Sequence, residues 1–264
     1  MTSLTQSIDR NKKTAFKGTA KTYNKIRSGY PVELVKRICL ECNLTARSHA
    51  LEIGCGTGIA TRTFEDLGFK IHAIDIADDL LECAKICATD PDTTFELISF
   101  EHFIPQAAFD LVFSATAFHW VDPKIGYEKV WQCLQDDGVF LILSNIPSFD
   151  EHTRTELDQI YLKLAPSLTS SGRDRRSTTE IALSDQLEYF STTRRFKDFR
   201  RFNHNWEREF SGDDYVALLS TYSDHILLDK KEGLFRGVKE YIENRSTAFK
   251  VYYETVALVA NKRI

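Results

Sequence analysis

The residues with the clearest chemical potential lie in and around the stretch Leu51-Glu52-Ile53-Gly54-Cys55-Gly56-Thr57-Gly58. Glycine accepts a positive φ without a Cβ clash, so three glycines after a short apolar run predict a strand, a tight turn and the start of a helix. Such a turn lets a ligand approach the backbone amides at the N-terminus of the helix. The stretch therefore predicts a ligand-binding turn.

Two details of this stretch indicate the class of ligand. A dinucleotide-binding turn has glycine at its first, third and sixth positions, but the sixth position from Gly54 is Ile59, and the third glycine comes one residue early, at Gly58. Glu52 would repel a pyrophosphate, whereas it suits a ligand with ammonium and sulfonium charges. S-adenosylmethionine carries these charges. A nicotinamide-dependent oxidoreductase is therefore disfavoured.

The glycine stretch resembles the first motif of the class I S-adenosylmethionine-dependent methyltransferases, and the resemblance extends over nearly the whole chain. Two later stretches, Phe109–Ala115 and His119–Asp122, also resemble that family. The pattern Tyr23-x-x-x-Arg27-x-x-Tyr30-Pro31 is similar to the N-terminal lid of the type 11 subgroup, which includes trans-aconitate methyltransferase-like proteins. The chain departs from this lid pattern at Ser28, where proline is usual.

The resemblance implies S-adenosyl-L-methionine as the cofactor. Asp75 closes a predicted strand 21 residues beyond Gly54, the distance at which a carboxylate in a βαβ unit reaches the ribose hydroxyls. Ser99 stands where the family usually has an aspartate for the adenine amino group, so adenine recognition should rely more on backbone groups and Phe100, with Glu101 as the nearest alternative carboxylate. The cofactor-binding candidates are Tyr23, Arg27, Glu52, Gly54, Cys55, Gly56, Gly58, Asp75, Ile76, Ser99, Phe100, Glu101 and Ala115.

His119 and Trp120 follow the fourth predicted strand, at the end where open α/β sheets bind ligands. They either pack as ordinary core residues or line a pocket. Methyl transfer from a sulfonium mainly requires alignment of nucleophile and methyl in a dry site. A carboxylate acceptor needs no base, whereas for an alcohol or phenol His119 is the catalytic candidate. The acceptor-binding candidates are Tyr30, His119, Trp120, Trp206, Arg208 and Tyr222.

The elements that must position these residues alternate between strand and helix patterns over residues 49–146. Strands are expected before Gly54 and at 69–75, 94–99, 109–115 and 139–143, and helices at 59–67, 80–88 and 123–134. Two later strands, 199–210 and 252–260, complete the set, and the resemblance makes the last one antiparallel. The expected fold is α/β, a Rossmann-like seven-stranded mixed sheet with helices on both faces, an N-terminal helical lid and a helical insertion or cap.

The predicted organisation has four parts. Residues 1–45 form a helical lid, 46–150 the cofactor-binding core, 151–195 a helical cap, and 196–264 the strands and helices that complete the sheet. A leading helix is expected from Phe16, and Tyr23, Arg27 and Tyr30 form either a lid or an amphipathic helix with polar tips in water. Residues 168–177 predict an exposed loop, whose Arg173, Arg175 and Arg176 are either solvated or attract an anionic substrate.

Composition narrows the function further. The chain has 264 residues, 42% of them hydrophobic, and a formal net charge of −4, which favours a small-molecule acceptor over nucleic acid. No apolar run suggests a membrane partner or a signal peptide, so a cytoplasmic location is expected. Six cysteines indicate reduced thiols. Cys39-x-x-Cys42 has no second pair at zinc-ribbon spacing, so no metal is expected. A monomer or weak dimer is expected.

The expected function is methyl transfer from S-adenosylmethionine to a small molecule by direct displacement. The resemblance of the N-terminal lid and the C-terminal part of the chain to trans-aconitate methyltransferase-like proteins implies a carboxylic acid as the acceptor. The alternative is a catalytically silent S-adenosylmethionine-binding protein with a regulatory or interaction role, for which the Ser99 departure gives some support. Amino-group targets in nucleic acid are disfavoured, because Thr116-Ala117-Phe118-His119 stands in place of an asparagine-proline-proline phrase.

Overall fold

The computed structural model describes residues 20–169 and 178–264, and its centre is a seven-stranded sheet in the order β3-β2-β1-β4-β5-β7-β6. Strands β1 to β5 run parallel, and β7 is antiparallel to both of its neighbours, so the expected mixed sheet with an antiparallel last strand is confirmed. The strands are β1 (His49–Ile53), β2 (Lys70–Asp75), β3 (Thr94–Leu97), β4 (Phe109–Ala115), β5 (Leu134–Ser148), β6 (Phe196–Phe210) and β7 (Phe249–Lys262).

Helices cover both faces of this sheet, as expected. One face packs against α3 (Val32–Glu41), α4 (Ile59–Glu65) and α5 (Asp78–Cys87), and the other against α6 (Pro123–Cys133) and α8 (Thr178–Thr192). Strand β4 shows how the sequence divides between the two layers, because Leu111 and Phe113 belong to the first core and Val112 to the second. This is the period-two alternation of a strand that is buried on both sides.

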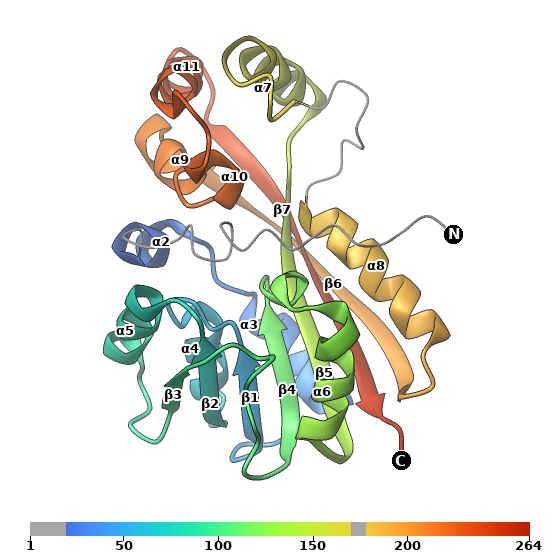
Figure 1. Ribbon diagram of the computed structural model, residues 1–264. Coiled ribbons are helices and arrows are strands. Elements are labelled where there is room, and N and C mark those ends of the chain that lie inside the picture. Colours follow the sequence, from blue (N-terminus) through green and yellow to red (C-terminus); the bar gives the residue numbers. More distant parts are fainter. Residues whose placement is uncertain (1–19, 170–177) are drawn as a thin grey trace.

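A third core lies beyond the parallel part of the sheet (Figure 1). Strands β5 and β6 have 15 residues each and β7 has 14, whereas β1 to β4 have four to seven. Several helices pack on the extended ends of the long strands, and we call these helices the cap. They are α7 (Glu151–Leu164), α9 (Gly212–Leu219), α10 (Ser223–Ile226) and α11 (Lys231–Glu243), and Ile26 of α2 (Ala20–Ile26) joins their core.

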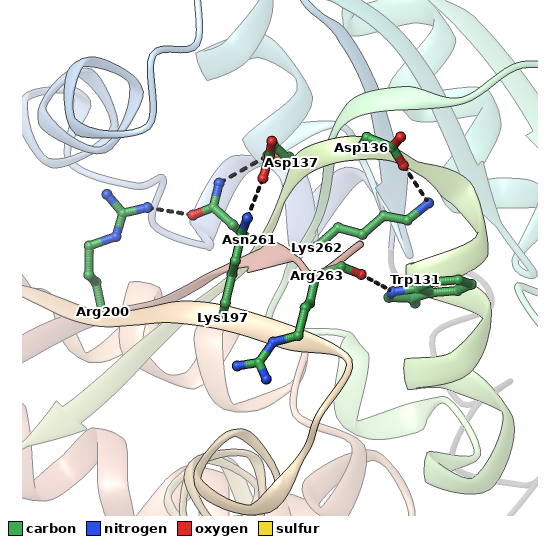
Figure 2. Close-up of polar contacts among 8 residues, drawn as sticks. All are labelled: Trp131, Asp136, Asp137, Lys197, Arg200, Asn261, Lys262 and Arg263. Carbon is green, nitrogen blue, oxygen red and sulfur yellow. Dashed lines mark hydrogen bonds and ion pairs between the residues drawn. The ribbon is translucent and has the colours of Figure 1, made fainter.

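Two elements differ most from the sequence-based expectation, β5 and α11. Strand β5 begins at Leu134 instead of residue 139, so residues 136–138 lie within it, with Asp137 at a φ of 61°. The last strand stabilises this irregular start. Lys262 Nζ donates to the Leu134 carbonyl at 2.7 Å. Asn261 Nδ2 donates to the Asp137 carbonyl at 3.0 Å, and Lys262 Nζ also lies 3.8 Å from Asp136 Oδ1 (Figure 2). Helix α11 was not expected from the sequence at all.

The remaining sequence-based expectations about structure have mixed outcomes. Ser211, a residue type favoured at the N-cap, caps α9, since its Oγ accepts from the Asp214 amide at 3.1 Å. The start of the leading helix at Phe16 and the loop arginines Arg173, Arg175 and Arg176 lie outside the described residues. Within residues 20–169 and 178–264, no helix is long and apolar enough to cross a membrane, and no group of three His, Cys, Asp or Glu residues could hold a metal ion.

Candidate functional site

A cavity of about 450 Å³ lies between the carboxyl ends of β1, β2 and β4 and the cap. This volume falls within the range of small-molecule sites. One wall comes from the glycine turn and the strand ends, and the opposite wall from α7, α9, α10 and β7. The cavity therefore has two chemically distinct ends, which we call the strand end and the cap end.

The glycine turn shapes the strand end. Gly54, Gly56 and Gly58 all have positive φ, at 71°, 56° and 75°. A Cβ at Gly54 would lie 2.6 Å from the Cβ of Ala117, so that glycine is needed for close packing. A Cβ at Gly56 would meet no protein atom within 4 Å and would project into open space. The turn is thus a preformed cradle whose open side only a ligand can fill.

Two buried acids stand beside this cradle. Glu52 is 1% exposed and its Oε2 accepts from Thr61 Oγ1 at 2.5 Å, while burial raises its pKa to about 8. Asp75 accepts from the Gly56 amide at 2.7 Å and from the Ala77 amide at 2.8 Å, and burial also raises its pKa. Desolvation dominates both shifts because neither carboxylate has a cation bonded to it. A cationic ligand would stabilise both ionised acids.

A third group of residues extends the strand end past β3. Ile98, Phe100 and Glu101 line the cavity, and the Ile98 amide donates to the Asp75 carbonyl at 2.9 Å, which places this loop next to Asp75. Ser99 does not line the cavity, and its hydroxyl contacts His102 Nδ1 at 2.7 Å. A flat ring beside Asp75 would therefore meet Phe100 and Glu101 in preference to Ser99.

Arg27 and Tyr30 reach the cavity from the N-terminal segment. The Arg27 guanidinium lies 4.9 Å from the Tyr23 ring centre and 4.2 Å from that of Tyr222. Its Nε donates to Thr221 Oγ1 at 2.8 Å and its Nη2 to the Thr221 carbonyl at 2.9 Å. Tyr30 OH lies 2.8 Å from Thr116 Oγ1. These contacts hold the segment against the cavity, which Tyr23, Arg27 and Tyr30 line.

His119 and Trp120 line the cavity from the short 3-10 turn Phe118–Trp120, directly after β4. The two rings lie 4.8 Å apart between centroids. Burial lowers the pKa of His119 to about 4, so the imidazole is neutral near pH 7. A neutral imidazole can donate or accept one hydrogen bond and presents no positive charge to a substrate.

Most candidates from the sequence converge on this cavity, and four do not line it. These four are Gly58, Ser99, Trp206 and Arg208. Trp206 stacks on Tyr253 at 4.3 Å and donates to Thr255 Oγ1, so it lies behind the wall. Arg208 donates to the Ile26 carbonyl at 2.7 Å and to Ser28 Oγ at 3.2 Å, and thereby holds the lid segment.

The sequence reasoning missed much of the cap end. Its side chains include Asn145, Phe149, Tyr161, Tyr215, His225 and Tyr253. They come from the carboxyl end of β5 and the residues that follow it, from α7, α9 and α10, and from β7. Of the predicted acceptor-binding residues that line the cavity, Tyr222 is the one at the cap end, and it lies three residues before His225.

Comparisons with known proteins find methyltransferases among the similar proteins. Residues 51–142 match a methyltransferase domain family. Malonyl-(acyl-carrier protein) O-methyltransferase 1 of Ilyobacter polytropus is 32% identical over 46% of this chain and 45% of its own length, and the Bacillus anthracis protein with the same activity in its name is 24% identical over 69% and 81%. The chain thus spans about half the length of the first of these relatives.

Solved structures share the fold. A protein of Anaeromyxobacter dehalogenans described as a type II methyltransferase superposes with a TM-score of 0.64 at 18% identity, covering 89% of this chain and 97% of that one. At this identity the likeness bears on the fold. The likeness confirms the fold class expected from the sequence. The match of residues 51–142 to a methyltransferase domain agrees with the family that the sequence resembles.

Proposed function

We propose that this chain, a member of the type 11 group of S-adenosylmethionine-dependent methyltransferases, methylates a carboxylic acid at oxygen by direct displacement. The observation that carries the proposal is the charge layout of the cavity. Buried acids stand at the strand end, and Arg27 is the one Arg or Lys among the described lining residues. A cationic cofactor and an anionic acceptor suit these two ends.

The strand end fits S-adenosylmethionine, the cofactor of this family. Its open cradle at Gly56 and its pair of buried acids match a ligand with ammonium and ribose groups. Glu52 would hold the ammonium group and Asp75 the ribose hydroxyls, while Phe100 and Glu101 would contact the base. When bound, the cofactor supplies a methyl group on sulfonium, a leaving group that is already activated.

The chain's own contribution is then to position the acceptor and exclude water. Arg27 would orient a carboxylate through the Nη1 N–H groups that its contacts with Thr221 leave over. The rings of Tyr23 and Tyr222 on either side of the guanidinium, and Tyr30, would shield the reacting atoms. Correct placement alone can supply about 7 to 11 kcal/mol of the barrier.

A carboxylate acceptor also agrees with the state of His119. A carboxylate is already ionised near pH 7, so no proton has to be removed before it attacks. With its pKa lowered to about 4, His119 is neutral and would contribute shape and one hydrogen bond. The names of the two malonyl-(acyl-carrier protein) O-methyltransferases support an oxygen nucleophile as well.

The test is binding followed by turnover with purified protein. We expect calorimetry to detect S-adenosylhomocysteine, and radiolabelled methyl groups to move from S-adenosylmethionine to members of a carboxylic acid panel as base-labile esters. Absence of cofactor binding would exclude the methyltransferase. Binding without transfer to any acceptor class would favour the silent regulatory alternative. Transfer only to amines would contradict the carboxylate acceptor. A cytoplasmic location and the absence of nucleic-acid partners are part of the same proposal.

A further inference from the structure

The cap end of the cavity is walled by aromatic side chains. Four tyrosines and one phenylalanine line it, from α7, α9, β7 and the segments that follow β5 and α9. They are Phe149, Tyr161, Tyr215, Tyr222 and Tyr253. Ligand sites of this size are commonly apolar and aromatic with a few placed polar groups. The wall provides large flat surfaces next to Arg27.

Neighbouring side chains hold these rings in place. Tyr253 stacks on Trp206 with centroids 4.3 Å apart and an interplanar angle of 10°. Tyr215 packs edge-on against Phe249 at 4.8 Å, and Tyr161 OH lies 2.7 Å from His225 Nε2. Since the rings are fixed before any ligand arrives, a flat ligand would lose little free energy to their ordering.

The positive charge available to a substrate here is small. Arg27 already donates from Nε and Nη2 to Thr221, so its remaining N–H donors can hold one carboxylate. His225 is neutral near pH 7 because burial lowers its pKa to about 4. Further carboxylates would face tyrosine rings and Asp224, another lining residue. Burying a charge without a partner is costly.

We propose that the acceptor is a monocarboxylic acid with an aromatic or conjugated body, whose carboxylate meets Arg27 and whose flat body packs on the cap wall. This inference rests on the proposed methyltransferase function and narrows its substrate class. It departs from the resemblance to trans-aconitate methyltransferase-like proteins, because trans-aconitate carries three carboxyl groups. It also excludes a short malonyl thioester, which lacks a flat apolar body.

Calorimetric titrations with three probe acids test the preference in the presence of saturating S-adenosylhomocysteine. The probes are cinnamate, trans-aconitate and malonyl-N-acetylcysteamine. We expect cinnamate to bind at least tenfold more tightly than the other two. Equal or tighter binding of either competitor overturns the inference, and so does a lack of binding by all three acids while S-adenosylhomocysteine binds.

Two variants at one position separate the ring from its hydroxyl group. Tyr161→Phe keeps the ring and loses the contact with His225, whereas Tyr161→Ala loses both. An aromatic contact contributes enough for about a tenfold change, so the Kd of cinnamate should be about tenfold higher in Tyr161→Ala than in Tyr161→Phe. The Kd of S-adenosylhomocysteine should match in the two variants. Equal cinnamate affinity in both overturns the role of the wall.

Failure of the inference and failure of the proposed function are distinguishable. If S-adenosylhomocysteine does not bind the wild type, the methyltransferase proposal fails. The same three acids are then titrated against the cofactor-free protein, where a tenfold preference for cinnamate would support the wall and its absence would overturn it.

Discussion

The affinity for the cofactor should rise steeply with pH because of Glu52. In the free protein its buried carboxyl has a pKa of about 8, so it is mostly protonated at pH 6. A bound ammonium group would require the ionised form, and binding would release the proton. About 1% of Glu52 is ionised at pH 6 and about half at pH 8, which gives roughly a 50-fold gain in affinity, or about 2 kcal/mol.

The assay is calorimetric titration of S-adenosylhomocysteine between pH 6 and 9, in buffers of different ionisation enthalpy so that proton release is counted directly. We expect the affinity of the wild type to increase up to about pH 8 and then level off. Glu52→Gln is the control, since it keeps the shape and a hydrogen-bonding group for Thr61 Oγ1 but cannot titrate.

The amino group of the ligand also titrates, but it contributes equally to the pH profiles of the wild type and Glu52→Gln. The difference between the two profiles therefore reports Glu52 alone. Glu52→Gln should bind more weakly than the wild type at pH 8 and should lack the steep part of the profile. The reasoning is refuted if the wild-type affinity is flat between pH 6 and 8, or if the same slope persists in Glu52→Gln.

Further predictions concern the turn, the histidine and the base of the sheet. Gly54→Ala should lower the free energy of unfolding, measured through the Tm, by about 1–3 kcal/mol, because its Cβ would lie 2.6 Å from Ala117 Cβ at a positive φ. Gly56→Ala should lower the free energy of unfolding by only about 1 kcal/mol and should weaken S-adenosylhomocysteine binding. A larger loss of stability in Gly56→Ala together with a larger loss of binding in Gly54→Ala would contradict the cradle. At saturating cofactor, the pH profile of kcat should show no step from His119 between pH 6 and 8, since its pKa is about 4. A fall of kcat below pH 7 in the wild type that disappears in His119→Phe would refute this prediction. Lys262→Met should lower the free energy of unfolding by about 1–3 kcal/mol in urea with cofactor affinity unchanged, because Lys262 Nζ bonds the Leu134 carbonyl. Lys250→Met, which loses an ion pair with Glu207 at the surface, is the control and should change the free energy of unfolding little.

The strand end of the cavity was predictable because its signals are local in the sequence. The turn from Gly54 to Gly58 and the carboxylate at Asp75 belong to one βαβ unit, so spacing alone brings them together. Strand β4 was predicted with its observed bounds, Phe109–Ala115, because a strand buried on both faces has a largely apolar sequence instead of a strict alternation. Ser99 was expected as the last residue of the strand 94–99, whereas β3 ends at Leu97 and the Ser99 hydroxyl contacts His102.

The cap end was less predictable because it depends on contacts between distant segments. Alternation along β6 correctly assigns Trp206 and Arg208 to one face of the strand. It cannot say that Tyr253 lies between Trp206 and the cavity, since that depends on pairing with β7. In the same way, the start of β5 at Leu134 depends on Lys262 of the last strand. Such long-range contacts leave no periodic pattern in the sequence.

The N-terminal segment connects the two ends of the cavity. It bonds the strand end through Asn24, which accepts from Arg62 Nη2 at 2.9 Å, and through Tyr30 at Thr116. It bonds the cap end through Arg27 at Thr221. A cofactor that contacts the glycine turn and an acceptor that contacts Arg27 would therefore both act on this one segment. A displacement of about 1 Å from the productive geometry can cost about 100-fold in rate, so a weaker Arg27–Thr221 contact should lower kcat even in a variant that still binds both ligands. Thr221→Val removes the hydroxyl partner of Arg27 Nε. In single-turnover measurements, this variant should therefore show a slower methyl-transfer step than the wild type.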